Sequence, residues 1–423
     1  MSSVSPQDPW VQVSEIVRLV RSGEAQTRPE LADATRLGRN IITQRIQAAA
    51  ELGLVRPSGQ QRSRGGRAAD VWEFHGDEGR ILTGVVGSFG LRVALTDLDG
   101  RVVEETWLPG ELTADPVETS ERMAVAMEAL MRRHHPDGPA WGVGIGLPTP
   151  VDFLTGRSTS PVTAGPPGAT WPSDFDIRRW FTRRMQAPVW VDSNSNLSAL
   201  GAAAAADAPE DLIVVRMERG VGSGIVSDGR LHRGADWIAG EITHVTVQGE
   251  GEPICLCGRV GCLDAYASRW AIEAEAVALA ATGASAYLTE HGTDLDVVVA
   301  GAEAGDLGCA RLVLRAADAM GRALAALVTW FNPRRVVIGG NVLAESSLFQ
   351  SAVGRTLHMH ALAASVQHLE VRYSTSDRPE ELQGAAAMVL EVLLSAEYMA
   401  EWAPAGFPID VEVLLAKHAD LLA

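Results

Sequence analysis

Apolar residues at helical spacing open the chain and predict three short helices. They recur every three or four positions over residues 11–21, up to a stop at Ser22-Gly23. The run Thr27-Arg28-Pro29-Glu30 has the form of a capping box with proline in the first turn, so we expect a second helix through Ala34. A third helix is expected over residues 39–52, after a glycine turn.

The third predicted helix leaves polar residues on the exposed side of its first half. They are Arg39, Asn40, Thr43, Gln44 and Arg45. Two short helices joined by a glycine turn, with such donors and acceptors on the second, predict a helix-turn-helix that reads the major groove of DNA. An arginine-rich segment follows, before a strand at residues 70–74, and predicts a wing that reaches phosphates through Arg62, Arg64 and Arg67. The alternative is a protein-docking module with a solvated loop.

Runs of apolar residues predict an α/β body after residue 80. Strands are expected at residues 81–86, 91–97, 101–106 and 142–147, with a helix at 116–133 before the last of them. A buried strand at 190–192 leads into an alanine-rich helix. From Leu212 the plan begins a second time, with Gly220, Gly222 and Gly224 between two strands. This recurrence predicts two similar lobes with a cleft between them.

The later part of the body has weaker signals. A helix is expected over residues 312–330, then a strand that ends at Gly339-Gly340, and a last helix that begins near Gly384. We therefore expect four parts: a winged helix-turn-helix over residues 1–77, a first lobe over 78–205, a second lobe over 206–400, and a tail over 401–423 to which we assign no role.

Charge is divided unevenly between these parts. The chain has 423 residues, 46% of them hydrophobic, and a net charge of −17. Residues 1–76 hold ten arginines against eight acids, a net of +2, which leaves 26 basic and 45 acidic residues, a net of −19, for the rest. A small basic head on an acidic body is expected if only the head meets a polyanion. With no long apolar run and no leader-like start, we expect a soluble protein of the cytoplasm, away from membranes.

Three of the four cysteines stand close together behind one histidine. His244, Cys255, Cys257 and Cys262 are the ligand types of a closed tetrahedral zinc site, and glycines occupy the turns between them. The alternative is three buried thiols and a core histidine. Cys255 and Cys257 lie two positions apart in a glycine-rich segment, where burial of two thiols in an apolar core is an unusual use. The sequence therefore predicts bound Zn²⁺.

Two motifs in this region resemble the ROK family (repressor, open reading frame, kinase). They are Gly240-Glu241-x-x-His244 and Cys255-x-Cys257-Gly258-x-x-Gly261-Cys262. The resemblance implies a two-lobed actin-like, ribonuclease-H-like ATPase fold, a zinc site made by the histidine and three cysteines, and a bound sugar that Glu241 and His244 face. The winged head followed by Gly65-Gly66-Arg67 looks like the repressor branch of that family.

Three segments depart from the family's kinases, whose ATP and sugar motifs are Asp-x-Gly-Gly-Thr, Gly-Thr-Gly-x-Gly and Asn-Asp-x-Asn. In their places stand Val85 to Phe89, the run from Gly220 with Val221 in place of threonine, and Ser193-Asn194-Ser195-Asn196. The first departure removes a carboxylate that would organise magnesium. The third removes the base, because an amide such as Asn194 has no useful basicity near neutral pH. We therefore expect no phosphoryl transfer.

The expected function is that of a sugar-responsive, zinc-containing transcriptional regulator, a repressor by family resemblance. It would bind operator DNA as a homodimer or homotetramer, and Asn194 and Asn196 are further candidates for contact with the sugar. Two alternatives stay open. One is an active sugar kinase with an appended DNA-binding head. The other is a regulator that no longer binds sugar and responds to a protein partner or to zinc.

Overall fold

The computed structural model describes residues 8–61, 69–110, 112–136, 138–162, 170–172, 174–247, 251–374 and 380–408. Its contacts divide the chain into two compact units. Unit 1 comprises Met1–Leu147, Asp152–Asp192 and Ala385–Ala423, and unit 2 comprises Pro148–Val151 and Ser193–Gly384. The head is therefore part of unit 1. Residues 385–400, which we expected in the second lobe, also belong to unit 1.

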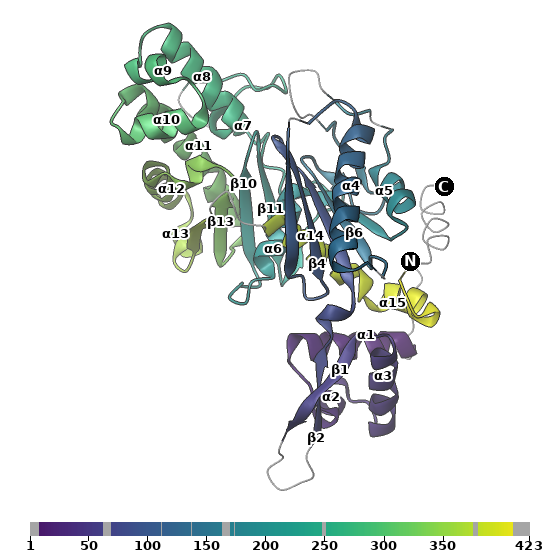
Figure 1. The fold of residues 1–423 in the computed structure, drawn as a ribbon. Helices are drawn as coiled ribbons and strands as arrows, with labels where there is room; N and C mark the ends of the chain where they lie inside the picture. Colours follow the sequence, from purple (N-terminus) through teal and green to yellow (C-terminus); the bar gives the residue numbers. More distant parts are fainter. Residues whose placement is uncertain are drawn as a thin grey trace. The chain divides into compact units, whose positions relative to one another are not determined.

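The head consists of three helices and a hairpin (Figure 1). These are α1 (Pro9–Ser22), α2 (Arg28–Thr35), α3 (Arg39–Glu51), β1 (Val55–Gln61) and β2 (Ala69–Phe74). The capping box is confirmed, since Thr27 and Glu30 each accept a hydrogen bond from the other's backbone amide. The Trp72 amide donates to the Gln26 carbonyl at 2.7 Å and ties the hairpin to the helices.

The rest of unit 1 is built on a five-stranded sheet of order β5-β4-β3-β6-β9. The strands are β3 (Arg80–Val86), β4 (Gly90–Asp97), β5 (Val102–Pro109), β6 (Gly142–Leu147) and β9 (Val189–Ser193). Pairing is antiparallel across β5, β4 and β3, and parallel between β3 and β6. Further elements are η1 (Gly76–Glu78), α4 (Pro116–His134) and α5 (Ile177–Met185). β8 (Arg157–Ser158) pairs with β7 (Val151–Asp152), whose first residue is the last of a short stretch assigned to unit 2.

Unit 2 repeats this plan in a second sheet, of order β12-β11-β10-β13-β14. Its strands are β10 (Leu212–Met217), β11 (Val221–Ser227), β12 (Arg230–Leu231), β13 (Arg335–Gly339) and β14 (Glu370–Tyr373). Two sheets of matching order in a mixed α/β chain confirm the expected two-lobed architecture.

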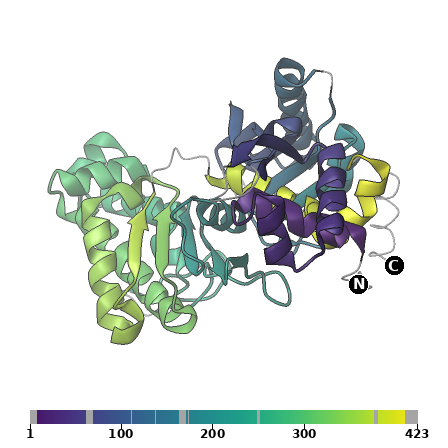
Figure 2. The same ribbon diagram turned by 90° about the horizontal axis from the view of Figure 1, so that it is seen from below.

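Helices cover both faces of the second sheet (Figure 2). α6 (Asn194–Ala203) packs Ala199 against Leu212 and Val214, while α11 (Leu307–Phe331) packs on the opposite face with Ile213 and Val215. The alternation of residues along β10 explains this division. The other helical elements of the unit are α7 (Asp264–Ala267), α8 (Arg269–Ala281), α9 (Ala286–His291), α10 (Leu295–Glu303), η2 (Val342–Glu345), α12 (Ser347–His360) and α13 (Ala363–Val366).

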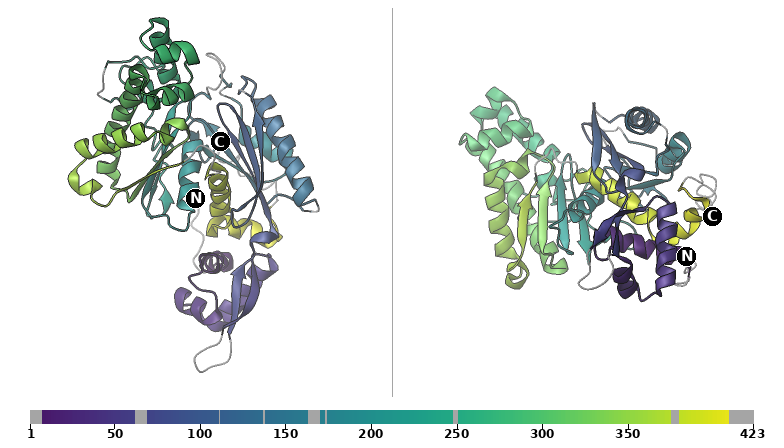
Figure 3. Two further views of the ribbon diagram at one scale, coloured as in Figure 1. Left: turned by 60° about the vertical axis from the view of Figure 1, so that its left-hand side comes forward. Right: turned by 60° about the horizontal axis from the view of Figure 1, so that its bottom comes forward.

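The chain passes from unit 2 back to unit 1 within a single helix, α14 (Glu380–Leu393). α15 (Ala396–Trp402) and η3 (Ala403–Ala405) follow, and α15 contacts α1 of the head, as two views in Figure 3 show. The Ser14 hydroxyl donates to the Leu394 carbonyl at 2.6 Å. The last helices of the chain thus connect the head to the rest of unit 1.

Among the described residues no single helix is long and apolar enough to cross a membrane. By length and composition alone, the pair Glu380–Leu393 and Ala396–Ala405, bent by 71°, passes the same test.

Candidate metal centre and DNA-facing helix

A short loop in unit 2 carries the three clustered cysteines. Cys255 donates its amide to the Arg259 carbonyl at 2.8 Å, and an isolated bridge joins Ile254 to Val260 on either side. Gly258 lies within this tight turn at φ +84°, in the left-handed region that glycine adopts without strain. The turn places Cys255 and Cys257 beside Cys262. An isolated β-bridge pairs Cys262 with Thr246, two residues after His244.

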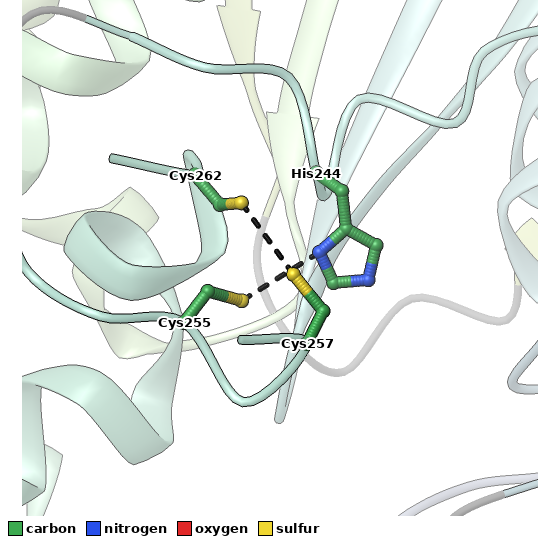
Figure 4. A group of neighbouring side chains, drawn as sticks. All are labelled: His244, Cys255, Cys257 and Cys262. Carbon is green, nitrogen blue, oxygen red and sulfur yellow. Dashed lines mark hydrogen bonds between the residues drawn. The ribbon is translucent and has the colours of Figure 1, made fainter. Parts of the chain in front are cut away.

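The four predicted ligands converge on one point. The ligand atoms of His244, Cys255, Cys257 and Cys262 all lie within 4.8 Å of one another (Figure 4). Cys255 Sγ is 3.6 Å from His244 Nδ1, and the Sγ atoms of Cys257 and Cys262 are 3.7 Å apart. Tetrahedral bonds of about 2.3 Å to sulfur and about 2.0 Å to nitrogen would separate these atoms by about 3.8 Å for S···S and about 3.5 Å for S···N. The residues present therefore fit a four-coordinate metal.

The thiols differ in acidity before a metal binds. Burial raises the pKa of the Cys255 thiol to about 12 and also raises the pKa of Cys262. The backbone amide of Arg259 donates to the exposed Cys257 and lowers its pKa to about 6. The lowered pKa favours the thiolate form of Cys257, which is the form that binds a cation.

Asp264 is a neighbour of the centre to which sequence reasoning assigned no role. It is buried, its Oδ2 accepts a hydrogen bond from Trp270 Nε1 at 2.8 Å, and the same oxygen is 3.9 Å from Cys255 Sγ. Burial raises the pKa of this carboxyl group. The sequence signal for Asp264 was its position two residues after Cys262, the last cysteine of the cluster.

The loop that carries Glu241 is held against β11. The Ser223 hydroxyl donates to the Gly240 carbonyl at 2.6 Å, and a methyl group at Gly240, which has φ +85°, would lie 2.4 Å from the Ser223 carbonyl oxygen. The Thr243 hydroxyl contacts both the Glu241 carboxylate and the Val221 carbonyl. Thr243 therefore orients Glu241, a role that the sequence motif did not reveal.

Asn194 and Asn196 lie in the first turn of α6, and both are buried. The Ser193 hydroxyl caps this helix by accepting the Asn196 amide at 3.2 Å. Because Gly222 and Gly224 face α6 whereas Ser223 contacts the Gly240 loop, the two asparagines and Glu241 belong to segments on opposite faces of β11.

The glycines at 222 and 224 lie within a strand, where we expected a loop between strands. β11 begins at Val221, so the turn comprises residues 218–220. A methyl group at Gly224 would lie 2.5 Å from the Ser195 carbonyl oxygen, and one at Gly222 would lie 2.3 Å from the Ser195 hydroxyl. These glycines allow α6 to approach the sheet closely.

The first half of α3 has the exposure expected of a DNA-reading surface. Arg39, Asn40, Thr43 and Gln44 are all exposed. Arg45 differs, because it is half-buried and its Nε donates to Gln12 Oε1 on α1 at 2.9 Å. No side chain caps the helix at Gly38, so its first amides are open to an anion. Arg62, Arg64 and Arg67 lie outside the described residues.

Comparison with known proteins gives a family match. The model described as "ROK family" matches residues 85–392. The chain belongs to the ROK family. A xylose repressor from Caldicellulosiruptor bescii is 24% identical over 388 residues, which cover 90% of this chain and 95% of the relative. A glucokinase from Halalkalibacterium halodurans is 29% identical over 299 residues, which cover 69% and 88%.

A solved structure shares the fold of this ROK chain. It is described as a ROK family transcriptional regulator, a homolog of the E. coli MLC protein. The TM-score is 0.78 at 20% identity, and the match covers 92% of this chain and 98% of that one. Together with the duplicated sheets, this likeness confirms the expected actin-like, ribonuclease-H-like fold.

Two turns of this ROK protein stand where the phosphate loops of the family's kinases are expected. In the first, Val85 is buried within β3 and Phe89 is 52% exposed in the turn that follows. In the second, Val221 is buried at the start of β11, and Glu218 pairs with Arg216. The Glu218 carboxylate thus has a structural partner within unit 2.

Trp171 packs within unit 1. It is buried, donates its Nε1 to the Thr113 carbonyl at 3.0 Å, and meets Phe175 edge-on with ring centroids 6.0 Å apart. These contacts explain why the Trp171 ring is buried and give it a packing role within unit 1.

Proposed function

We propose that this ROK protein is a sugar-responsive transcriptional regulator of the cytoplasm, a repressor, that binds operator DNA with its winged head. The observation that carries the proposal is the exposed first half of α3, with Arg39, Asn40 and Gln44 beside open helix amides. The relatives support it, since the xylose repressor matches nearly the whole chain whereas the glucokinase matches a smaller part.

DNA binding is tested with duplexes that the full-length protein enriches from a random pool. Fluorescence anisotropy across salt should give a steep electrostatic slope, and Arg39→Ala should weaken binding and reduce that slope by about one. Arg132→Ala is a matched control, because Arg132 is exposed on α4, outside the head. A pool that yields no enriched duplex would contradict the proposal.

We infer that the metal is zinc. Three thiolates and one imidazole at tetrahedral spacing are a donor set typical of structural Zn²⁺, and they leave no open coordination position. The bound ion would fix the segment that joins Glu241 to the cysteine loop. His244 presents Nδ1 to the sulfurs, and its Nε2 points away from them in Figure 4. That nitrogen is then available to donate to a sugar hydroxyl.

The effector would be a sugar held by Glu241 and His244. Asn194 and Asn196 stay predicted amide contacts, although α6 carries them on the opposite face of β11 from Glu241. A carboxylate held in place by Thr243 can accept hydrogen bonds from two neighbouring hydroxyls. A thermal-shift screen of hexoses, pentoses, amino sugars and their phosphates should find a stabilising ligand, and Glu241→Ala should remove the shift. Glu252→Ala is the control, since Glu252 is exposed in the same region. A melting temperature that changes on metal chelation but with none of the sugars would favour a sugar-independent regulator.

Loss of kinase activity is part of the proposal. Asn194 cannot take a proton from a sugar hydroxyl, and the segment from Val85 to Phe89 offers no carboxylate to organise magnesium. Incubation with ATP, Mg²⁺ and a sugar panel should yield no sugar phosphate above background. Robust turnover that disappears in Asn194→Ala would favour the alternative, an active sugar kinase with a DNA-binding head.

A further inference from the structure

A groove runs between α4 and α5, which lie side by side in unit 1 (Figure 1). Its volume is about 580 Å³, and it is lined by Val117 and Glu121 of α4, by Phe175, and by the outer face of α5 with Trp180. Val117 is 48% exposed, while Phe175 and Trp180 are half-buried. We call this feature the α4–α5 groove, and it presents aliphatic and aromatic surface to solvent.

The helix α5 adds positive charge to the α4–α5 groove. Its nine residues include four arginines and no acid. Arg178 is buried and donates to two backbone carbonyls, and Arg184 pairs with Glu121 at 3.3 Å. Arg179 and Arg183 are exposed, and neither guanidinium group has an ion-pair partner among the residues that the structure describes. Two cations of the groove are therefore available to an occupant.

The acids that line the groove are already engaged. Glu121 has Arg184, as stated, and Asp176 accepts a hydrogen bond from the Arg179 amide at 2.9 Å and lies 3.8 Å from Arg157. In a chain of net charge −17, two available cations beside aromatic side chains favour an occupant that combines carboxylates with apolar residues.

The sequence of residues 409–423, which lie outside the described residues, has this chemistry. Apolar residues recur in it at helical spacing and would form one face of a helix: Val411, Leu414, Leu415, Leu421 and Leu422. At 100° per residue, Asp410 and Glu412 would flank that face on either side. Residues 1–7 and 163–169 of unit 1 contain no acid and match the groove less well.

The structure brings the start of this segment close to α4. Phe407 meets Trp141 edge-on with ring centroids 5.3 Å apart, and it lines a cavity together with His135, the residue after α4. Along α4 the distance from His135 to Glu121 in the groove is about 21 Å. Fifteen residues span about 22 Å as a helix and up to about 50 Å when extended. Residues 409–423 are therefore long enough to reach the groove.

We propose that residues 409–423 of this chain occupy the α4–α5 groove. The leucine face covers Trp180 and Val117, and the two flanking acids pair with the two available arginines of α5. Val125, which is 50% exposed on α4 two turns after Val117, extends the apolar surface toward Phe407. The segment thus has apolar side chains to cover along its path.

This docking has a consequence for the head. The segment follows α15, and α15 contacts α1. A segment held in the α4–α5 groove would fix the chain on the far side of α15, so the groove would contribute to the attachment of the head. This consequence does not depend on what the head binds.

Hydrogen exchange of the full-length chain, followed by mass spectrometry, tests the docking. Amides of residues 409–423 should exchange at least about tenfold more slowly than in a synthetic peptide of the same sequence, because docking protects them. Arg179→Glu combined with Arg183→Glu should return the rate close to that of the peptide. Arg355→Glu is the control and should leave the protection unchanged, since Arg355 is exposed on α12 in unit 2.

A charge exchange tests the ion pairs directly. Asp410→Arg combined with Glu412→Arg should also remove the protection, and joining these changes to the two glutamate substitutions of α5 should restore it, because opposite charges face each other again. Circular dichroism of all variants should match the wild type, since the two replaced arginines of α5 are exposed.

Two results would overturn the proposal. If the wild-type segment exchanges as fast as the free peptide, the groove does not hold it, and this is also the result expected if an acidic partner protein is the occupant. If the segment is protected but does not respond to charge reversal on α5, it docks elsewhere. Loss of DNA binding with intact protection would contradict the proposed function alone.

Discussion

The two sheets of this ROK protein have the same strand order but carry different additions. The orders are β5-β4-β3-β6-β9 and β12-β11-β10-β13-β14, and in each the third strand pairs antiparallel with the second and parallel with the fourth. The first sheet is joined to the head through α15 and α1. The second holds the metal loop and α7 to α10 between β12 and α11. The two sheets thus share a strand order, while the segments added to them, the head in unit 1 and the cysteine loop with α7 to α10 in unit 2, differ in their residues.

The difference extends to the turns that end the first strands of the two sheets. In unit 1 the turn after β3 leaves Phe89 half-exposed, and in unit 2 the turn after β10 contains Glu218, paired with Arg216. The two sheets therefore share a strand order, while the turns after β3 and β10 carry unrelated side chains. If each unit is stabilised around its own sheet, changes in one unit should leave the other largely intact.

Removal of the proposed zinc should have the largest effect, confined to unit 2. With free zinc at about a thousand times its dissociation constant, binding contributes about 4 kcal/mol to the native state. For a unit of this size, chelation should lower its calorimetric transition by roughly 8–16 °C. Cys262→Ser should do the same and reduce the zinc content measured by native mass spectrometry.

Cys309→Ala provides the control for metal loss. Cys309 is buried in the core of unit 2 but lies outside the cluster of ligands. This variant should keep its zinc while losing some stability, since a small cavity is left behind. If chelation lowers the melting temperature of unit 1 as much as that of unit 2, the effect is not confined to unit 2 and the prediction is wrong.

The glycines of β11 offer a second test within unit 2. Gly224→Ala should destabilise the protein by about 1–3 kcal/mol, because the new methyl group meets the backbone of Ser195 on α6. Gly222→Ala should cost less, since only the Ser195 hydroxyl must rotate. Urea denaturation measures both. Equal stability of the two variants and the wild type would argue against a packing role.

A third test concerns α3 of unit 1, which we propose reads DNA. Asn40→Ala and Gln44→Ala should each weaken specific binding by about 1–3 kcal/mol, because amide side chains in the major groove read base edges. Arg45→Ala should have a smaller effect on DNA binding than Arg39→Ala, since Arg45 contacts Gln12 on α1. Anisotropy with an enriched duplex measures all four. Equal losses for the two arginines would show that Arg45 turns to DNA.

The sequence predicted best what depends on local chemistry. The cluster of His244 with three cysteines stood out because the residue types and their spacing are restrictive. The capping box at Thr27 was recognisable because both partners lie within four residues. The strands of the first sheet were predictable from continuous apolar runs, as in β6. These signals need no knowledge of distant contacts.

The errors arose where distant contacts decide. Gly222 and Gly224 were expected in a loop, because a glycine has no side chain to reveal the face of a strand, and their role depends on Ser195 in another element. Thr243 and Asp264 were overlooked because their importance depends on partners that only the folded loop brings near. The return of the chain to unit 1 at Ala385 was likewise missed, since it depends on packing of α14 and α15.

The smallest predicted effect concerns the attachment of the head to unit 1. Ser14→Ala removes the hydrogen bond to the Leu394 carbonyl, which links α1 to the end of α14. The loss should cost about 1 kcal/mol, since a part-buried carbonyl is left without its partner. Hydrogen exchange of α1 amides should accelerate about fivefold if the helix opens locally. Ser22→Ala is the control, because the Ser22 hydroxyl bonds only within its own end of α1 and to Glu24. DNA affinity that is unchanged while the sugar response weakens would indicate that this junction carries the signal from the body to the head.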